Sequence, residues 1–202
     1  MKIEDMISAI QKKLNVDVDG KAGPQTWGAI YERLVGDTID GLKPSNALAL
    51  VDSRSEKTIA TLLPEVQPIA RALVQKAQGI GITIKIISGL RTYAEQNALY
   101  AQGRTADGHI VTNARGGYSN HNFGIAFDVG VFEGSKYLPE SSKYKAVGAL
   151  GVDLGLEWGG NWKTIVDQPH FQLRPSWAAG MAEKQMLAQL RQRKNDDQTV
   201  YA

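Results

Sequence analysis

Apolar residues recur along the chain at spacings that predict several helices. A spacing of three to four residues predicts a helix over 3–14, and Thr26 is positioned to cap a second one. The same spacing runs through 56–77, where Pro64 and Pro68 should break or bend the helix. These segments are therefore expected to be helical, with interruptions at the prolines.

Later segments alternate between strand and helix patterns. Three short runs of β-branched or apolar residues predict strands over 82–88, 125–131 and 171–173. Helical spacing predicts helices over 92–102, 144–154 and 177–193. Residues 103–120 are rich in Gly, Asn and Arg and should form a long loop of functional importance. The mixture indicates a small α+β domain, with a short antiparallel sheet flanked by helices.

The distribution of small and polar residues suggests the domain organisation. Gly, Pro, Asp and Ser are scattered through 37–55, which is typical of a linker. This linker would separate a helical module over 1–36 from a larger domain over 56–180, followed by a C-terminal helix and tail over 181–202. The 202 residues suffice for one ordinary domain with a small appendage.

Composition excludes several classes of function. The net charge of +2 is too small to argue for a nucleic-acid partner. The absence of cysteine excludes disulfides, thiolate metal sites and cysteine nucleophiles. No apolar run has the length of a signal peptide or a membrane span. We therefore expect a monomer that is made in the cytoplasm and must be released to act elsewhere.

Two histidines and a carboxylate stand where loops enter predicted strands. His121 and Asp128 are seven residues apart, and His170 immediately precedes the last strand. Two imidazoles and one carboxylate leave one position of a tetrahedral zinc ion open, as in catalytic sites. We therefore predict that these three residues bind Zn²⁺, which would lower the pKa of a bound water toward ~7.

Hydrolysis at such a site also requires an acid–base group and a stabiliser of negative charge. Asp167 lies three residues before His170, across Pro169, and is the candidate base. Arg91, just past the first predicted strand, is the candidate cation for the developing oxyanion. The third histidine, His109, is expected to be an ordinary loop residue.

These residues belong to a longer set of motifs. The set comprises Ser88-Gly89-Leu90-Arg91 with Glu95-Gln96, Ser119-x-His121-Asn122-x-Gly124-x-Ala126-x-Asp128, Leu156-Glu157-Trp158-Gly159-Gly160-x-Trp162, and Asp167-x-Pro169-His170-Phe171. The set resembles the zinc D,D- and L,D-peptidases of the VanY and VanX type, peptidase family M15. Within that family it is most similar to the L-alanyl-D-glutamate endolysins of bacteriophages.

The resemblance implies roles for individual residues. It assigns zinc binding to His121, Asp128 and His170, and the catalytic carboxylate to Asp167. It also implies that Arg91 steadies the substrate carbonyl or its oxyanion and that Ser119 and Gln96 contact the substrate peptide. VanX-like relatives usually carry Glu-x-x-His at the last ligand, whereas Asp-x-x-His here favours the endolysin branch.

A second resemblance concerns the N-terminal segment. Ile10-Gln11-x-x-Leu14, followed by Asp19-Gly20-x-x-Gly23-Pro24-x-Thr26, is similar to the peptidoglycan-binding helical module of wall hydrolases. The match covers about half of such a module, because its first helix has no counterpart. The alternative is a small helical hairpin packed on the enzyme.

Aromatic and basic residues suggest further contacts. Trp158 is expected to face the substrate cleft, whereas Trp162 has core packing as an equal alternative. The C-terminal helix combines apolar residues with Lys184, Arg191 and Lys194. It is expected either to pack its apolar face on the domain or to make weak contact with an outer membrane or lipopolysaccharide, without stable insertion.

The function expected from these observations is that of an endolysin. It would cut the peptidoglycan stem peptide at the L-Ala–D-Glu bond, at the cell wall or periplasm, after release from the cytoplasm. One alternative is a D-Ala-D-Ala carboxypeptidase or dipeptidase of the same family, and another is a wall-binding protein without activity. A glycan-cleaving lysin would need a carboxylate pair drawn from Glu133, Glu140 and Glu157.

Overall fold

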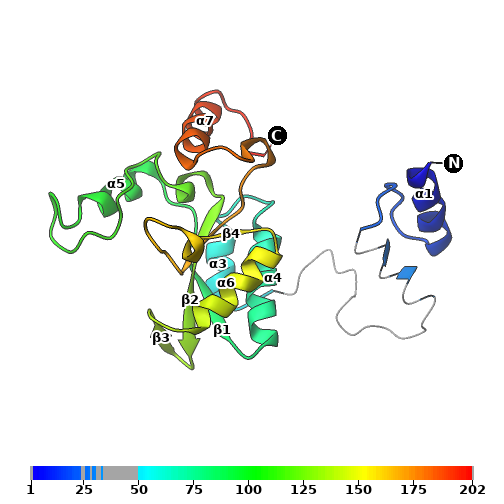
Figure 1. The fold of residues 1–202 in the computed structure, drawn as a ribbon, viewed down its shortest axis with the longest axis horizontal. Coiled ribbons are helices and arrows are strands. Elements are labelled where there is room, and N and C mark those ends of the chain that lie inside the picture. Colours follow the sequence, from blue (N-terminus) through cyan, green and yellow to red (C-terminus); the bar gives the residue numbers. More distant parts are fainter. Residues whose placement is uncertain (1, 24–25, 28, 31–32, 34–49, 202) are drawn as a thin grey trace. The chain divides into compact units, whose positions relative to one another are not determined.

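The computed structural model divides the chain into two compact units, residues 1–49 and 50–202. It describes residues 2–23, 26–27, 29–30, 33 and 50–201 (Figure 1). The residues that are described in the expected helix after Thr26, namely 27, 29, 30 and 33, are helical. The greater part of the expected linker over 37–55 lies outside the described residues. The expected domain boundaries therefore stay predictions.

The N-terminal unit is organised around a buried glutamine. Helix α1 spans Ile3–Leu14, which confirms the prediction for 3–14. Gln11 is 1% exposed; its amide donates to Asp19 Oδ1 at 2.7 Å and accepts from the Gly20 N–H at 2.9 Å. Thr26 also faces Gln11, with 3.0 Å between Thr26 Oγ1 and Gln11 Nε2. Thr26 is therefore wrong as a helix cap, because its hydroxyl serves this buried network instead.

The larger unit contains a five-stranded antiparallel sheet with the order β1-β2-β5-β4, and β3 also pairs with β2. This confirms the α+β class. The strands are β1 (Thr83–Ser88), β2 (Ala126–Glu133), β3 (Lys136–Leu138), β4 (Glu157–Trp158) and β5 (His170–Gln172). The helices are α3 (Ser53–Ile59), α4 (Gln67–Gly79), α5 (Tyr93–Ala101), α6 (Lys143–Asp153) and α7 (Glu183–Asn195).

The main core lies between the sheet and helices α3, α4 and α6, which gather beside β1 and β2 in Figure 1. Buried side chains from all of these elements form one cluster, including Ile59, Leu73, Val129, Val147 and Phe171. Burying each such side chain contributes roughly 1.5–3 kcal/mol. The core thus fixes the positions of β2 and β5, which carry the candidate ligands.

A second cluster fastens the C-terminal helix to the domain. Met186, Leu187 and Leu190 of α7 pack with Phe123 and Ile125. Basic residues of the helix also lie over aromatic rings: Arg191 over Tyr118, Arg193 over Trp177 and Lys194 over Tyr93. These contacts support the packing alternative for this helix; contact with an outer membrane stays a prediction. None of the described helices combines the length and the apolar composition of a membrane span.

Several element boundaries differ from the sequence predictions. Helix α3 begins at Ser53, inside the segment assigned to the linker, because Asp52 caps it by accepting from the Ser55 N–H at 3.1 Å. The last helix begins at Glu183 rather than 177, after a short 3₁₀ turn over Ser176–Ala178. Strands β3 and β4 were missed, because two or three residues are too few to show alternation.

Candidate functional site

Strand pairing brings the predicted ligands together. Asp128 on β2 and His170 on β5 are direct partners in the antiparallel ladder, so their side chains share one face. Asp128 also lies opposite Ser88 of β1, where the register shifts between Ile86 and Ser88. His121 lies on a 3₁₀ turn, η1 (Asn120–Phe123), which feeds into β2. Such irregularities beside a ladder often re-aim side chains at functional sites.

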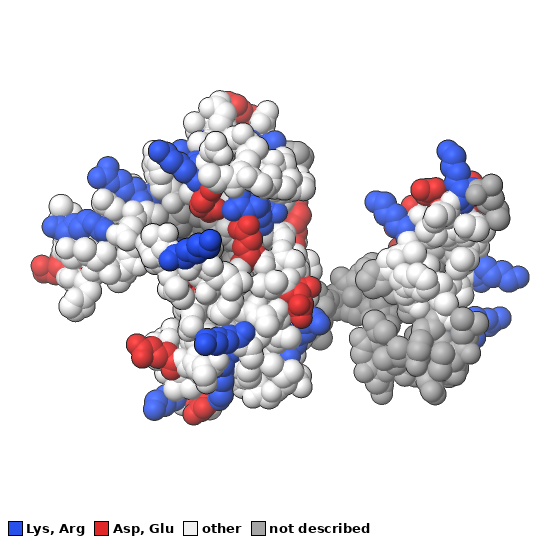
Figure 2. All heavy atoms as spheres, viewed as in Figure 1, with Lys and Arg blue, Asp and Glu red and all other residues white. Residues whose placement is uncertain are grey.

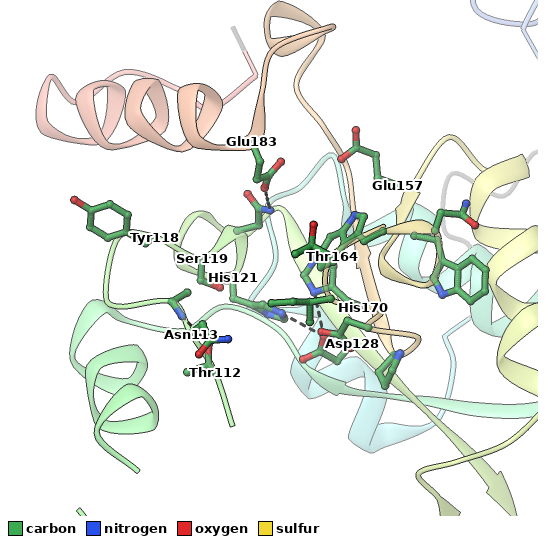
Figure 3. Close-up of a pocket in the computed structure, with 18 of the residues that line it drawn as sticks. Thr112, Asn113, Tyr118, Ser119, His121, Asp128, Glu157, Thr164, His170 and Glu183 are labelled. Atoms are coloured by element: carbon green, nitrogen blue, oxygen red, sulfur yellow. Dashed lines mark hydrogen bonds and ion pairs between the residues drawn. The ribbon is translucent and has the colours of Figure 1, made fainter. Parts of the chain in front are cut away.

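The three side chains converge to the geometry that a metal ion requires (Figure 3). One ligand atom from each of His121, Asp128 and His170 lies within 4.8 Å of the others. Asp128 Oδ1 is 3.3 Å from His121 Nε2 and 3.3 Å from His170 Nδ1. Two imidazole nitrogens and one carboxylate oxygen suit zinc, with room for a fourth ligand. The residues present therefore fit the predicted metal.

The two rings turn their other nitrogens toward acceptors. His121 Nδ1 is 2.8 Å from the carbonyl oxygen of Gly89. His170 Nε2 is 2.9 Å from Gln172 Oε1. A hydrogen bond at the remote nitrogen fixes the tautomer of a metal-binding histidine and its ring orientation. The rings would thus coordinate through different atoms, Nε2 of His121 and Nδ1 of His170.

Burial and charge shape the electrostatics of this group. Burial by itself would raise the pKa of Asp128, but His121 and His170 together hold that pKa well below its ordinary value. Burial disfavours the charged form of His170, yet Asp128 raises the pKa of the ring. The site therefore concentrates negative charge on one carboxylate shared by two imidazoles, which favours a bound cation.

Arg91 and Gln96 form a chain of hydrogen bonds that ends on Asp128. The Arg91 guanidinium donates to Asp128 Oδ2 at 3.1 Å and to Gln96 Oε1 at 2.9 Å. Gln96 is fully buried and donates to the Ala114 carbonyl at 2.9 Å. Contact between Gln96 and the substrate therefore stays a prediction; in the structure its amide holds Arg91. Arg91 does line the cleft, but its guanidinium is also engaged in orienting Asp128.

Asp167 lies on the same turn as His170. The His170 N–H donates to the Asp167 carbonyl at 3.2 Å, and the Asp167 N–H donates to the Gly159 carbonyl at 3.1 Å. Burial raises the pKa of Asp167, and the charge of Asp128 raises it further. A Cβ at residue 159 would collide with the Asp167 carbonyl, so only glycine permits this close approach. Asp167 lines the cleft, as a general base must.

His121, Asp128 and His170 line an open cleft of about 1390 Å³, together with residues of the surrounding loops. This volume exceeds that of typical small-molecule pockets, so the cleft can accept a segment of a polymer. Ser119 and Tyr118 line one side, and Thr164 of the 159–169 loop also lines the cleft (Figure 3). Figure 2 shows the face of this unit hollowed below α7, with acidic and basic side chains close together.

Both tryptophans line the cleft. Trp158 reaches the cleft, but it also packs on the main core and donates through Nε1 to the Gln168 carbonyl at 2.8 Å. Trp162, for which core packing was an equal alternative, lies with its ring 4.9 Å from that of His170. Trp162 is therefore the aromatic residue next to the metal group. His109 is exposed on its loop and stands apart from the ligands.

Sequence reasoning missed a polar network next to His170. Its members come from η1, β4, β5, α7 and the segment after β5, and all of them line the cleft or pack directly behind it. They are Asn120, Glu157, Gln172, Arg174 and Glu183. No local spacing reveals this group, although the position of Gln172 two residues after a predicted ligand, on the same strand face, could have suggested it.

Two proteins of known activity are similar to this chain over most of the larger unit. Peptidoglycan L-alanyl-D-glutamate endopeptidase CwlK of Bacillus subtilis (strain 168) is 39% identical over 127 residues, which are 57% of this chain and 75% of CwlK. The L-alanyl-D-glutamate peptidase of Listeria phage A118 is 30% identical over 123 residues, which are 59% of this chain but 41% of that protein.

One family model and one solved structure also match part of this chain. The M15 peptidase model described as D-alanyl-D-alanine carboxypeptidase matches residues 112–173. The crystal structure of the L-Ala D-Glu endopeptidase ChiX of Serratia marcescens is 26% identical, with a TM-score of 0.48, over 61% of this chain and 88% of that one. Because this chain covers three quarters of CwlK at 39% identity, it belongs to the M15 family of peptidases.

Proposed function

We propose that this protein is a zinc-dependent peptidase that cuts the L-Ala–D-Glu bond of peptidoglycan stem peptides at the bacterial cell wall. The observation that carries the proposal is the convergence of His121, Asp128 and His170 in one cleft that Asp167 also lines. The names of the two similar proteins, CwlK and the phage A118 enzyme, support the choice of bond.

Different residues of the chain would have different roles in hydrolysis. Zinc held by the three ligands would polarise the scissile carbonyl and lower the pKa of water. Asp167 would take a proton from the attacking water and give it to the leaving amine, for which its burial-raised pKa is suited. Arg91 would keep Asp128 oriented, and the loop walls with Ser119 would align the stem peptide.

A D-Ala-D-Ala carboxypeptidase is the second candidate, favoured by the description of the family model. That activity needs a group that captures the free carboxylate of the substrate. Arg91 is the natural candidate, but its guanidinium is already bonded to Asp128, Gln96 and Ser88. This engagement supports the endopeptidase.

The test is digestion of purified peptidoglycan, with new amino termini identified by mass spectrometry. We expect new D-Glu termini that disappear with a chelator and return when zinc is added. Asp167→Asn should lower the rate by roughly 10²–10⁴-fold. The same variant should bind zinc as the unmodified protein does, because Asp167 is not one of the three ligands.

The other outcomes distinguish the alternatives. Release of free D-Ala would identify a carboxypeptidase. Reducing sugar ends that form in the presence of chelator would point to a glycan hydrolase. Binding to the wall with no cleavage under any condition would leave a wall-binding protein.

A further inference from the structure

We propose that Gln172 is a positioning residue for the metal, and that helix α7 holds it in place through Glu183 and Asn120. This inference rests on the zinc site of the proposed function and extends it to a part of the chain beyond the matched residues 112–173. It predicts that metal affinity depends on a helix that carries no ligand.

The orientation of the Gln172 amide follows from its neighbours. Its Nε2 lies 2.6 Å from Glu157 Oε2, and a carboxylate oxygen can only accept, so the nitrogen must face Glu157. Its Oε1 then faces His170 Nε2 at 2.9 Å, and that nitrogen must donate. The lone pair of the ring is therefore left on Nδ1, the atom that faces Asp128.

The network continues from Gln172 to α7. The Asn120 amide donates both to Gln172 Oε1, at 2.5 Å, and to Glu183 Oε1. Arg174 joins the two acidic residues, because it donates to Glu157 and, at 2.8 Å, to Glu183 Oε2. Gln172 and Asn120 are both buried, so the bond between them is shielded from water and orients the two amides strongly, whereas the bonds to Glu157 and Glu183 are part-buried.

Asn120 provides a second, independent argument. Its Oδ1 is buried and has no hydrogen-bond partner among the described residues. An unsatisfied buried acceptor is destabilising, so an amide is a poor choice here for stability alone. Its Nδ2 is the atom that links Gln172 to Glu183, which is the function that we assign to it.

The first experiment measures zinc affinity by competition with a chelator. Gln172→Leu keeps the approximate volume but removes the acceptor for His170, and should weaken zinc binding by roughly 10–100-fold. The double variant Glu157→Gln with Gln172→Glu exchanges amide and carboxylate. It should restore most of the affinity, because a carboxylate at 172 accepts from His170 and an amide at 157 donates to it.

The second experiment tests the connection to α7 without altering Gln172. Glu183→Ala removes the anchor of Asn120 and should weaken zinc binding in the same direction. Lys184→Ala changes the neighbouring, exposed residue of the same helix and should leave zinc binding unchanged. Melting temperatures of the metal-free proteins establish that each variant is folded.

A spectroscopic measurement separates positioning from general destabilisation. In the zinc-loaded protein, long-range ¹H–¹⁵N spectra should show a His170 Nε2–H that exchanges slowly with solvent. In Gln172→Leu that proton should exchange fast, whereas the Nδ1–H of His121 should be unaffected because it donates to Gly89. Unchanged zinc affinity in Gln172→Leu would overturn the inference; failure of the unmodified protein to bind zinc would overturn the proposed function itself.

Discussion

The two histidines proposed as zinc ligands are held by different kinds of partner. His121 faces the backbone carbonyl of Gly89 through its ring, and its own carbonyl accepts from the Arg91 N–H at 3.0 Å. His170 instead faces the side chain of Gln172, within a network that reaches α7. A ligand held by main chain can be disturbed only by moving the main chain. A ligand held by side chains can be altered by substituting one residue at a time.

Removing either imidazole ring should cause the largest loss of zinc binding and activity, whichever kind of partner holds the ring. His121→Ala and His170→Ala each leave two ligands, which are too few for a stable zinc site. We expect zinc binding to fall below detection and cleavage of peptidoglycan to fall to the level of the blank. His109→Ala, which changes the exposed third histidine, is the control and should retain full activity. Substantial activity in either ligand variant would refute the assigned site.

Two glycine substitutions should displace His121 and His170 separately. A Cβ at Gly89 would lie 2.5 Å from Thr61 Oγ1, so Gly89→Ala should displace the carbonyl that holds His121. A Cβ at Gly159 would collide with the Asp167 carbonyl, so Gly159→Ala should displace the turn that carries His170. Since a displacement of 1 Å can cost about 10²-fold in rate, we expect losses of roughly 10–10² in kcat/KM for each.

The control for both is Gly79→Ala, because nothing lies within 4 Å of a Cβ there. It should leave kcat/KM unchanged. If Gly89→Ala altered the Nε2–H exchange of His170 as strongly as that of the His121 Nδ1–H, the two sides would not be independent.

The pKa of Asp167 should report how strongly burial affects the carboxyl group next to His170. Burial, assisted by Asp128, raises the pKa of this carboxyl, so in metal-free protein it should titrate above its ordinary value of 3.8. Because the base must be deprotonated, its contribution to the rate is present above that pKa and lost as pH falls through it. Bound zinc should move the midpoint downward, since a nearby cation favours the carboxylate.

Carbon-13 NMR of the carboxyl groups measures this directly. Asp52 is the internal reference: burial opposes its ionisation, but hydrogen bonds from Ser55 lower its pKa overall. A midpoint for Asp167 at or below that of Asp52 would contradict the prediction.

The smallest predicted effect is a change in stability, caused by breaking an ion pair distant from His121 and His170. The Arg71 guanidinium donates to both oxygens of Glu56, with Nη2 2.8 Å from Oε2, and lowers the pKa of Glu56 although burial opposes this. Glu56→Gln should lower the free energy of unfolding by roughly 0.5–1 kcal/mol at neutral pH. A lowered pKa stabilises the fold above the unfolded-state value and ceases to do so as pH falls through the folded-state value.

Chemical denaturation at several pH values tests this. The difference between Glu56→Gln and the unmodified protein should disappear at acidic pH, and zinc affinity should be the same in both. The exposed pair of Lys143 and Glu133 is the comparison, and Glu133→Gln should give no measurable change. A pH-independent difference would show that the charge of Glu56 is not the cause.

The predicted ligands could be read from the sequence because each lies at a recognisable transition. His121 ends a loop, Asp128 lies within an apolar run and His170 precedes another. Local pattern therefore placed His121 where a loop enters a strand, Asp128 on that strand and His170 before a neighbouring strand, and β2 and β5 do lie side by side. The convergence of Asp128 and His170 then follows from antiparallel pairing. Asp167 also lines the cleft, while its catalytic role stays a prediction.

The supporting residues could not be found in this way. Asn120 and Glu183 are 63 residues apart, and Asn120 and Gln172 are 52 apart. Nothing in the sequence around either partner indicates the other, because their contact depends on how α7 packs on η1. Gln96 was predicted from its position in a motif to contact the substrate, which stays a prediction; its burial and its hydrogen bond from Arg91 could not be predicted from that motif.

The direct pairing of Asp128 with His170 also has a consequence for folding. If β5 slipped by one residue along β2, His170 would turn to the opposite face of the sheet and no longer meet Asp128. A metal that binds only the correct pairing stabilises that pairing and no other. Zinc binding would then favour folded molecules in which β5, a strand of only three residues, pairs with β2 in the native register.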